Sequence, residues 1–112
     1  MRSVSTHILD TTFGKPAPNV PVLLEKRVRE NWEKAGGGWT DADGRIRDLV
    51  PEGQLEVATY RITFDTAAYY DLHDIQCFYP EVSVMFQIRD IESHYHVPLL
   101  VSPYGYSTYR GS

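Results

Sequence analysis

Apolar and polar residues alternate with a period of two along several stretches of the chain. Residues 82–89, "VSVMFQIR", show the pattern most clearly, because every second residue is apolar. Side chains alternate between the two faces of a strand, so this stretch predicts a strand with one buried face. The inward residues are Val82, Val84, Phe86 and Ile88, and the outward residues are Ser83, Gln87 and Arg89.

Similar strand patterns recur at short intervals. We expect strands over residues 3–10, 20–28, 44–50 and 54–64, and two more on either side of the Ser102–Gly105 turn. In the second of them, Val20, Val22 and Leu24 share one face. The three glycines at 36–38 predict either a hairpin turn or a bulge.

One helix is predicted over residues 65–73, "DTAAYYDLH". Asp65 or Thr66 can accept hydrogen bonds from the free amides of the first turn. Tyr69, Leu72 and His73 are expected to share one side of its two turns.

Seven or eight short strands with one short helix indicate an all-β fold, an antiparallel β-sandwich. The 112 residues suit one domain over residues 1–112, because the chain is too short for two cores. Exposed strand edges in such a fold can be hidden by pairing with another copy.

Composition narrows the function classes. The net charge of −4 argues against nucleic acid as the main partner, which would favour a basic excess. The single cysteine, Cys77, excludes an intramolecular disulfide framework and lies in an apolar stretch typical of a small buried residue. The opening residues lack the apolar segment of a signal peptide and no apolar run could span a bilayer, so we expect a soluble, cytoplasmic protein.

Two histidines stand two residues apart at His94 and His96. In an extended strand they point the same way, about 7 Å apart along one face. The pair is compatible with structural or surface histidines, with a general base near neutral pH, or with metal binding, which needs at least a third ligand. His7, alone in the first strand, gains a role only if the fold brings it near another candidate.

Arg45 follows "DADG", which differs from a calcium loop because Trp39 and Val50 occupy two acidic ligand positions. We interpret Asp43 and Gly44 as a turn before a strand. Arg45 is then either a surface residue or a planar donor set for an oxygen-rich ligand. At the end of the chain, Gly111 suits a close approach of the backbone to a ligand, although a flexible tail has the same composition.

Four segments together resemble the 5-hydroxyisourate hydrolases, the enzyme branch of the transthyretin-like family. They are "STHILDTTFGKPAPNVPVLLE", "TDADGRIRDL", "FYPEVSVMFQI" and "HYHVPLLVSPYGYSTYRGS", and the resemblance covers essentially the whole chain. The last is the most specific, since nineteen consecutive residues match the family's closing signature.

This resemblance implies a sandwich of two four-stranded sheets, assembled as a dimer of dimers with active sites in a channel between the dimers. It implies no metal and no cofactor. The implied catalytic residues are His7, Arg45, His96 and Ser112. The implied substrate-binding residues are His7, Arg45, Tyr109, Arg110 and Gly111. His94 matches the signature without an assigned catalytic role.

The family's reaction adds water to a ring carbonyl of 5-hydroxyisourate and gives 2-oxo-4-hydroxy-4-carboxy-5-ureidoimidazoline, on the route from urate to allantoin. We expect His7 or His96 to be the base and Arg45 to stabilise the oxyanion. The alternatives are a carrier of a small aromatic ligand and a metal-binding module built on His94 and His96.

Overall fold

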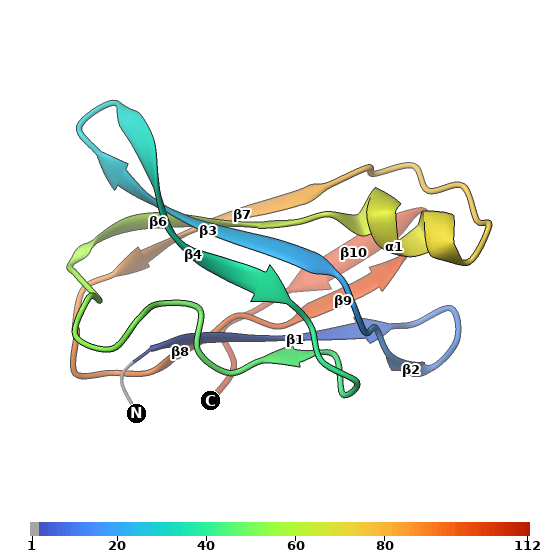
Figure 1. Ribbon diagram of the computed structural model, residues 1–112, viewed down its shortest axis with the longest axis horizontal. Coiled ribbons are helices and arrows are strands. Elements are labelled where there is room, and N and C mark those ends of the chain that lie inside the picture. Colours follow the sequence, from blue (N-terminus) through green and yellow to red (C-terminus); the bar gives the residue numbers. More distant parts are fainter. Residues whose placement is uncertain (1–2) are drawn as a thin grey trace.

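The computed structural model describes residues 3–112 and shows two β-sheets packed face to face (Figure 1). A short helix lies in the connection between two strands of one sheet, and the β3–β4 hairpin extends beyond the sandwich. The predicted β-sandwich class is confirmed. Residues 1 and 2 of the expected domain lie outside the described residues.

One sheet has four antiparallel strands in the order β4-β3-β6-β7. Their bounds are β3 Pro21–Val28, β4 Asn31–Trp39, β6 Ala58–Phe64 and β7 Val82–Ile88. The predicted alternation along β7 is confirmed, because its four inward apolar residues pack toward the core while Ser83 and Gln87 are exposed. The strand predicted over 54–64 starts only at Ala58.

The glycines at 36–38 lie inside β4 and not in a turn. The register between β3 and β4 shifts at the step from Leu24 to Glu25, so the bulge alternative is correct and the hairpin turn is wrong. A Cβ at Gly36 would stand 1.5 Å from the carbonyl oxygen of Leu49. Only glycine at position 36 therefore allows the loop that contains Leu49 to lie against the edge of β4.

The other sheet follows the path β10-β9-β1-β2, and β5 and β8 each add a short pairing with β1. The bounds are β1 Val4–Asp10, β2 Lys15–Pro16, β5 Arg45–Ile46, β8 Tyr95–His96, β9 Leu99–Ser102 and β10 Gly105–Thr108. Its path has the four strands expected, and β5 and β8 raise the total to six. β1 runs parallel to β8 and β9, whereas the other pairings are antiparallel. The strand expected over 44–50 is reduced to β5.

The helix α1, Thr66–Leu72, begins after Asp65, whose carboxylate accepts a hydrogen bond from the Ala68 N–H at 3.0 Å. This confirms the predicted N-cap. Tyr69 and His73 share one side as predicted, with ring centres 4.8 Å apart. Tyr69 and Tyr70 are buried, whereas Leu72 is 73% exposed. The buried face centres on the two tyrosines, and position 72 lies about 200° around the helix from position 70.

The core fills the space between the two sheets. Its completely buried side chains include Leu24, Tyr60, Ile62 and Phe64 from one sheet and Val4, Ile8 and Leu99 from the other. Cys77 is half-buried and packs against this core, as its sequence context predicts, and burial raises the pKa of its thiol. The core thereby fixes β1, which carries several side chains of the site described below.

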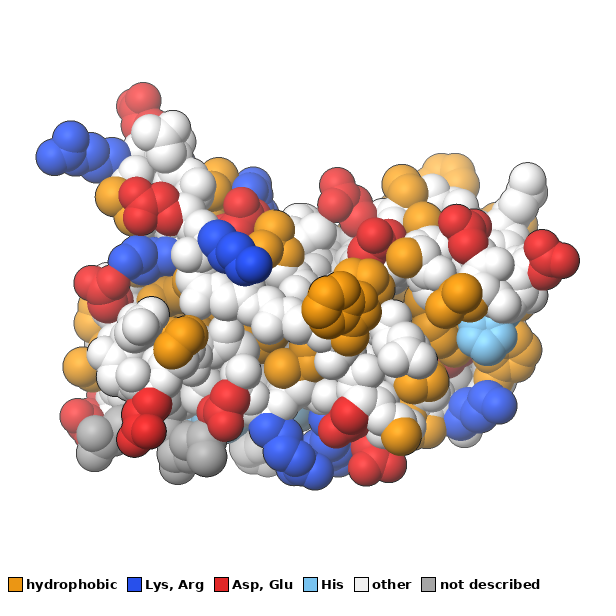
Figure 2. All heavy atoms as spheres, viewed as in Figure 1, with side chains coloured by type: hydrophobic (Ala, Val, Ile, Leu, Met, Phe, Trp, Pro, Cys, Tyr) orange, Lys and Arg blue, Asp and Glu red, His pale blue; other side chains and the backbone are white. Residues whose placement is uncertain are grey.

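Acidic and basic side chains are mixed over the face shown in Figure 2, and neither sign forms a large continuous area there. This agrees with the small net charge of −4. Within residues 3–112, none of the helical structure is both long and apolar enough to cross a bilayer.

Candidate active site

Two short pairings with β1 bring distant parts of the chain together. β5 pairs antiparallel with β1, which places Arg45 opposite His7. β8 pairs parallel with β1, which places His96 beside Ser5. Because Ser5 and His7 are two residues apart on one strand, their side chains lie on the same face.

The turn before β5 holds Arg45 through its backbone. The carboxylate of Asp41 accepts hydrogen bonds from the N–H groups of Asp43 and Arg45, each at 2.9 Å, which lowers the pKa of this carboxyl. Gly44 adopts φ +73°, and a Cβ there would stand 2.5 Å from the Ile8 carbonyl oxygen. The predicted Asp43-Gly44 turn is confirmed, and it brings β5 against β1.

A hollow of about 330 Å³ opens where β1, β5, β8 and the end of the chain meet. Three of the four predicted catalytic residues, Arg45, His96 and Ser112, line it. The fourth, His7, is half-buried opposite Arg45 and is not part of this lining in the single chain. The full lining is Ser5, Thr6, Arg45, Ile46, Arg47, His94, His96 and Ser112.

The hydroxyl of Ser5 lies between the two histidines of the closing segment. Its Oγ is 2.8 Å from Nε2 of His94 and 2.8 Å from Nδ1 of His96. The expectation that the two histidines share a face is confirmed, since the intervening Tyr95 is buried on the opposite side. The imidazole of His96 is thereby fixed in the hollow.

Several influences act on the protonation of His96. Burial is the largest, followed by the positive charge of Arg45 and by His7 and His94, and all of them lower the pKa of the imidazole from 6.5. A hydrogen bond with the Ser5 backbone opposes them. His96 is therefore mainly neutral at pH 7 and able to accept a proton.

The last residues of the chain lie in different places. The Gly111 N–H donates to the His96 carbonyl oxygen at 2.8 Å. Arg110 places its guanidinium 4.5 Å from the centre of the Tyr95 ring, outside the lining of the hollow, and Tyr109 is 58% exposed. The structure thus brings Ser112 to the hollow and Gly111 against His96, but leaves Tyr109 and Arg110 beside the hollow in the single chain.

Four polar residues of the lining received no catalytic or substrate-binding role from the sequence: Ser5, Thr6, Arg47 and His94. The period of two along a strand could have suggested two of them. Ser5 shares a face with His7, and Arg47 shares the side of Arg45 if the strand pattern continues. Nothing in the sequence indicated that Ser5 would lie between the two histidines.

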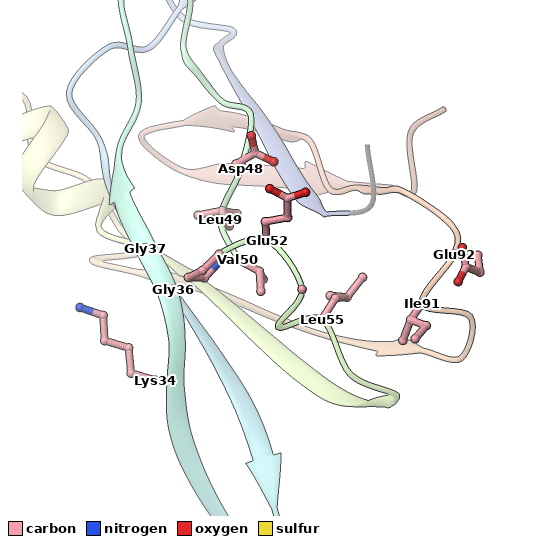
Figure 3. Close-up of a pocket in the computed structure, with 12 residues that line it drawn as sticks. Lys34, Gly36, Gly37, Asp48, Leu49, Val50, Glu52, Leu55, Ile91 and Glu92 are labelled. Atoms are coloured by element: carbon pink, nitrogen blue, oxygen red, sulfur yellow. The ribbon is translucent and has the colours of Figure 1, made fainter.

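A larger hollow, of about 910 Å³, lies beside β4 and the loop that follows β5 (Figure 3). Its polar lining consists of Lys34, Asp48, Glu52 and Glu92 around an apolar floor, without a histidine or arginine. None of the predicted catalytic residues lines it, so the smaller hollow is the better candidate. Among residues 3–112, no group of three or more His, Cys, Asp or Glu side chains is placed to hold a metal ion.

Comparison with known proteins identifies the family of the chain. Residues 4–111 match the HIUase/Transthyretin family, and the chain belongs to this family. It is 49% identical over 109 residues to the 5-hydroxyisourate hydrolase of Salmonella dublin, covering 97% of this chain and 80% of that protein.

The solved structures that resemble this chain include a hydrolase and a transthyretin. The 5-hydroxyisourate hydrolase of Klebsiella pneumoniae superimposes with a TM-score of 0.87 at 34% identity, covering 100% of this chain and 94% of that one. Transthyretin from Sparus aurata superimposes with a TM-score of 0.93 at 31% identity, covering 99% and 97%. A 5-hydroxyisourate hydrolase and a transthyretin therefore share this fold, and function must be inferred from the residues of the site.

Proposed function

We propose that the chain is a 5-hydroxyisourate hydrolase of urate degradation. It adds water to a ring carbonyl of 5-hydroxyisourate and yields 2-oxo-4-hydroxy-4-carboxy-5-ureidoimidazoline. One observation carries the proposal: a neutral imidazole, His96, and the Arg45 side chain line one hollow. The names of relatives such as the Salmonella dublin hydrolase support it.

Opening a cyclic amide requires a nucleophilic water and stabilisation of the developing oxyanion. His96 suits the base, because it lines the hollow and its lowered pKa keeps it unprotonated. Arg45 suits the oxyanion partner, since its guanidinium stays charged and its backbone N–H is held by the Asp41 carboxylate. His7, opposite Arg45, then contributes to binding or to proton transfer after the attack.

The closing residues complete this proposal. Ser112 lines the hollow, and its hydroxyl can hold the water or the substrate. Gly111 keeps the backbone close to His96. Tyr109 and Arg110 lie beside the hollow, so their predicted contacts with substrate require a rearrangement or a neighbouring subunit.

We further propose a homotetramer, a dimer of dimers with the sites in the channel between the dimers. β7 and β10 end their sheets, and the exposed aromatic residues Tyr104, Tyr106 and Tyr109 lie along or next to β10. Unpaired edges with exposed apolar residues favour pairing with further copies. Light scattering should give a tetramer mass at micromolar concentration. A monomer mass with full activity would refute the assembly. We also propose that the protein is located in the cytoplasm.

The test of function uses fresh 5-hydroxyisourate, made in place from urate by urate oxidase. Catalytic amounts of the chain should accelerate its decay in ultraviolet absorbance. His7→Ala, Arg45→Ala and His96→Ala should each lower turnover by at least about a hundredfold while circular dichroism shows a folded protein. A folded Arg45→Ala variant with normal turnover would remove Arg45 from the mechanism.

The second candidate is a carrier of a small aromatic ligand, favoured by the close superposition on Sparus aurata transthyretin. It predicts saturable binding of the ring without its consumption. A metal-binding module would instead lose activity on dialysis against a chelator, whereas the proposed hydrolase should keep it.

A further inference from the structure

Ser5 lies between the imidazoles of His94 and His96, and the proposed mechanism gives this serine no role. Its side chain lies on β1, is only 9% exposed, and lines the hollow. Its Oγ is 2.8 Å from one nitrogen of His94 and 2.8 Å from one nitrogen of His96. Both are good hydrogen-bond distances, so the hydroxyl bridges the two rings.

A serine hydroxyl carries one proton, so it can donate to only one of the two rings. In one arrangement Ser5 donates to Nδ1 of His96, whose proton then resides on Nε2. In the other, His96 donates its Nδ1 proton to Ser5, which donates to His94. Only the second arrangement leaves Nε2 of His96 with a free lone pair, because the Ser5 hydroxyl contacts the ring at Nδ1.

We propose that Ser5 is a positioning residue that keeps the proton of neutral His96 on Nδ1, so that Nε2 is the atom that takes the proton from the attacking water. His94 anchors this bridge by accepting the Ser5 proton at Nε2. The proton balance is simple: water gives one proton to Nε2 of His96, its oxygen bonds to the ring carbonyl carbon, and the Nδ1 proton stays in place. This inference rests on the proposed hydrolase activity for its kinetic part only.

The surroundings of His96 explain why such a bridge matters. His7 on β1, Arg45 and Arg47 at β5, and His94 before β8 are the basic groups around the ring. Among the described residues, the side chains that line the hollow include no Asp or Glu that would orient the imidazole, as aspartate does in catalytic triads. The neutral hydroxyl of Ser5 performs this orientation without an added negative charge.

The first test reads the tautomer directly and needs no substrate. Long-range proton–nitrogen NMR on protein with ¹⁵N-labelled histidine distinguishes a protonated ring nitrogen from an unprotonated one. At pH 7 to 8, His96 should show its proton on Nδ1, and Ser5→Ala should move that proton toward Nε2. Ser83→Ala is the matched control, because it removes a 2.8 Å contact between hydroxyls, with Thr63, on the other sheet.

The second test reads kinetics. Ser5→Ala should lower kcat by at least about tenfold with little change in KM, because losing the partner that orients an imidazole has effects of this size. His94→Gln keeps an acceptor for the Ser5 proton and should retain most of kcat, whereas His94→Leu should lose it as Ser5→Ala does. The two variants at position 94, His94→Gln and His94→Leu, test the inference even if Ser5→Ala fails to fold.

The outcomes separate this inference from the proposed function. A His96 proton on Nε2 in the parent protein, or equal kcat for His94→Gln and His94→Leu, would overturn the role of Ser5 while the hydrolase activity stood. A parent protein without turnover would refute the hydrolase and leave the tautomer result to decide the bridge.

Discussion

Gly111 and His96 are joined by more than one contact. The Gly111 N–H donates to the His96 carbonyl oxygen at 2.8 Å, and a Cβ added at Gly111 would stand 2.4 Å from Cδ2 of the imidazole. No carbon atoms approach so closely without a shift, so residue 111 sets the place of the proposed base. Gly111 and His96 are therefore expected to move together.

Gly111→Ala should therefore displace the imidazole or lift the chain end. We expect turnover to fall by at least about tenfold, because small misplacements of a catalytic group have large effects on rate. The melting temperature should change little, since position 111 lies outside the core. Gly105→Ala is the control, because its added Cβ would meet only the Ser102 hydroxyl, at 3.8 Å. Equal turnover for the two variants would contradict this packing argument.

The lowered pKa of His96 predicts a direction for the pH dependence of stability. Below pH 6.5, the usual pKa, the unfolded chain binds a proton that His96 resists in the folded chain. This part of the unfolding free energy is therefore complete above pH 6.5 and decreases as the pH falls toward the folded-state pKa. Urea unfolding from pH 7.5 to 5 should show the decrease, and His96→Gln should remove it. An unchanged slope in that variant would contradict the assignment.

Arg45 contributes to this shift through its positive charge. Arg45→Gln should raise the pKa of His96 toward its usual value, which NMR titration of the ring protons measures. Arg29→Gln, in the turn between β3 and β4, should leave it unchanged. A pKa of His96 that is equal in the two variants would place Arg45 too far from the ring to act on it.

The Tyr69 hydroxyl donates to Oδ2 of Asp10 at 2.8 Å and links α1 to β1. Tyr69→Phe leaves a buried carboxyl oxygen without this donor and should lower the unfolding free energy by about 1 to 3 kcal/mol. Tyr70→Phe is the matched control, since the buried Tyr70 hydroxyl makes no hydrogen bond of good geometry among the described residues, although Asp10 and Thr12 lie near enough to affect its pKa. Its removal should be neutral or stabilising. A larger loss for Tyr70→Phe in denaturant unfolding would reverse this interpretation.

Ser112 lines the hollow, so a peptide tag fused after it would introduce chain at the site. Such a fusion, or deletion of residues 110–112, should reduce turnover strongly while the melting temperature stays nearly constant. The same tag placed before Met1 should be harmless. Equal activity of the two fusions would mean that Tyr109 to Ser112 act as a tail that tolerates additions.

The strands and their faces followed from local alternation, because burial on one face leaves a period of two in the sequence. The inward face of β7, the Asp65 cap and the common face of His94 and His96 were predicted in this way. Alternation does not show which strands pair. The parallel contact of β1 with β8 joins residues about ninety positions apart, and it brings Ser5 to both histidines.

Most of the site residues were predicted from the resemblance to a family. In the structure, some of them line the hollow and others do not. Arg45, His96 and Ser112 line one hollow, whereas Arg110 packs over Tyr95. A guanidinium on a loop can pack over an aromatic ring or bind a ligand, and sequence spacing does not show which of the two contacts it makes. Its predicted contact with substrate stays a prediction.

Counting turnovers separates catalysis from simple binding. Freshly generated 5-hydroxyisourate is mixed in a large excess over chains, and the ultraviolet decay is followed against the spontaneous reaction and against Arg45→Ala and His96→Ala. We predict that each chain consumes many equivalents of substrate, at a rate proportional to protein concentration, and that both variants are slower by at least about a hundredfold. An absorbance change that stops at one equivalent per site, with the remaining substrate decaying at the spontaneous rate, would contradict the account and identify a carrier.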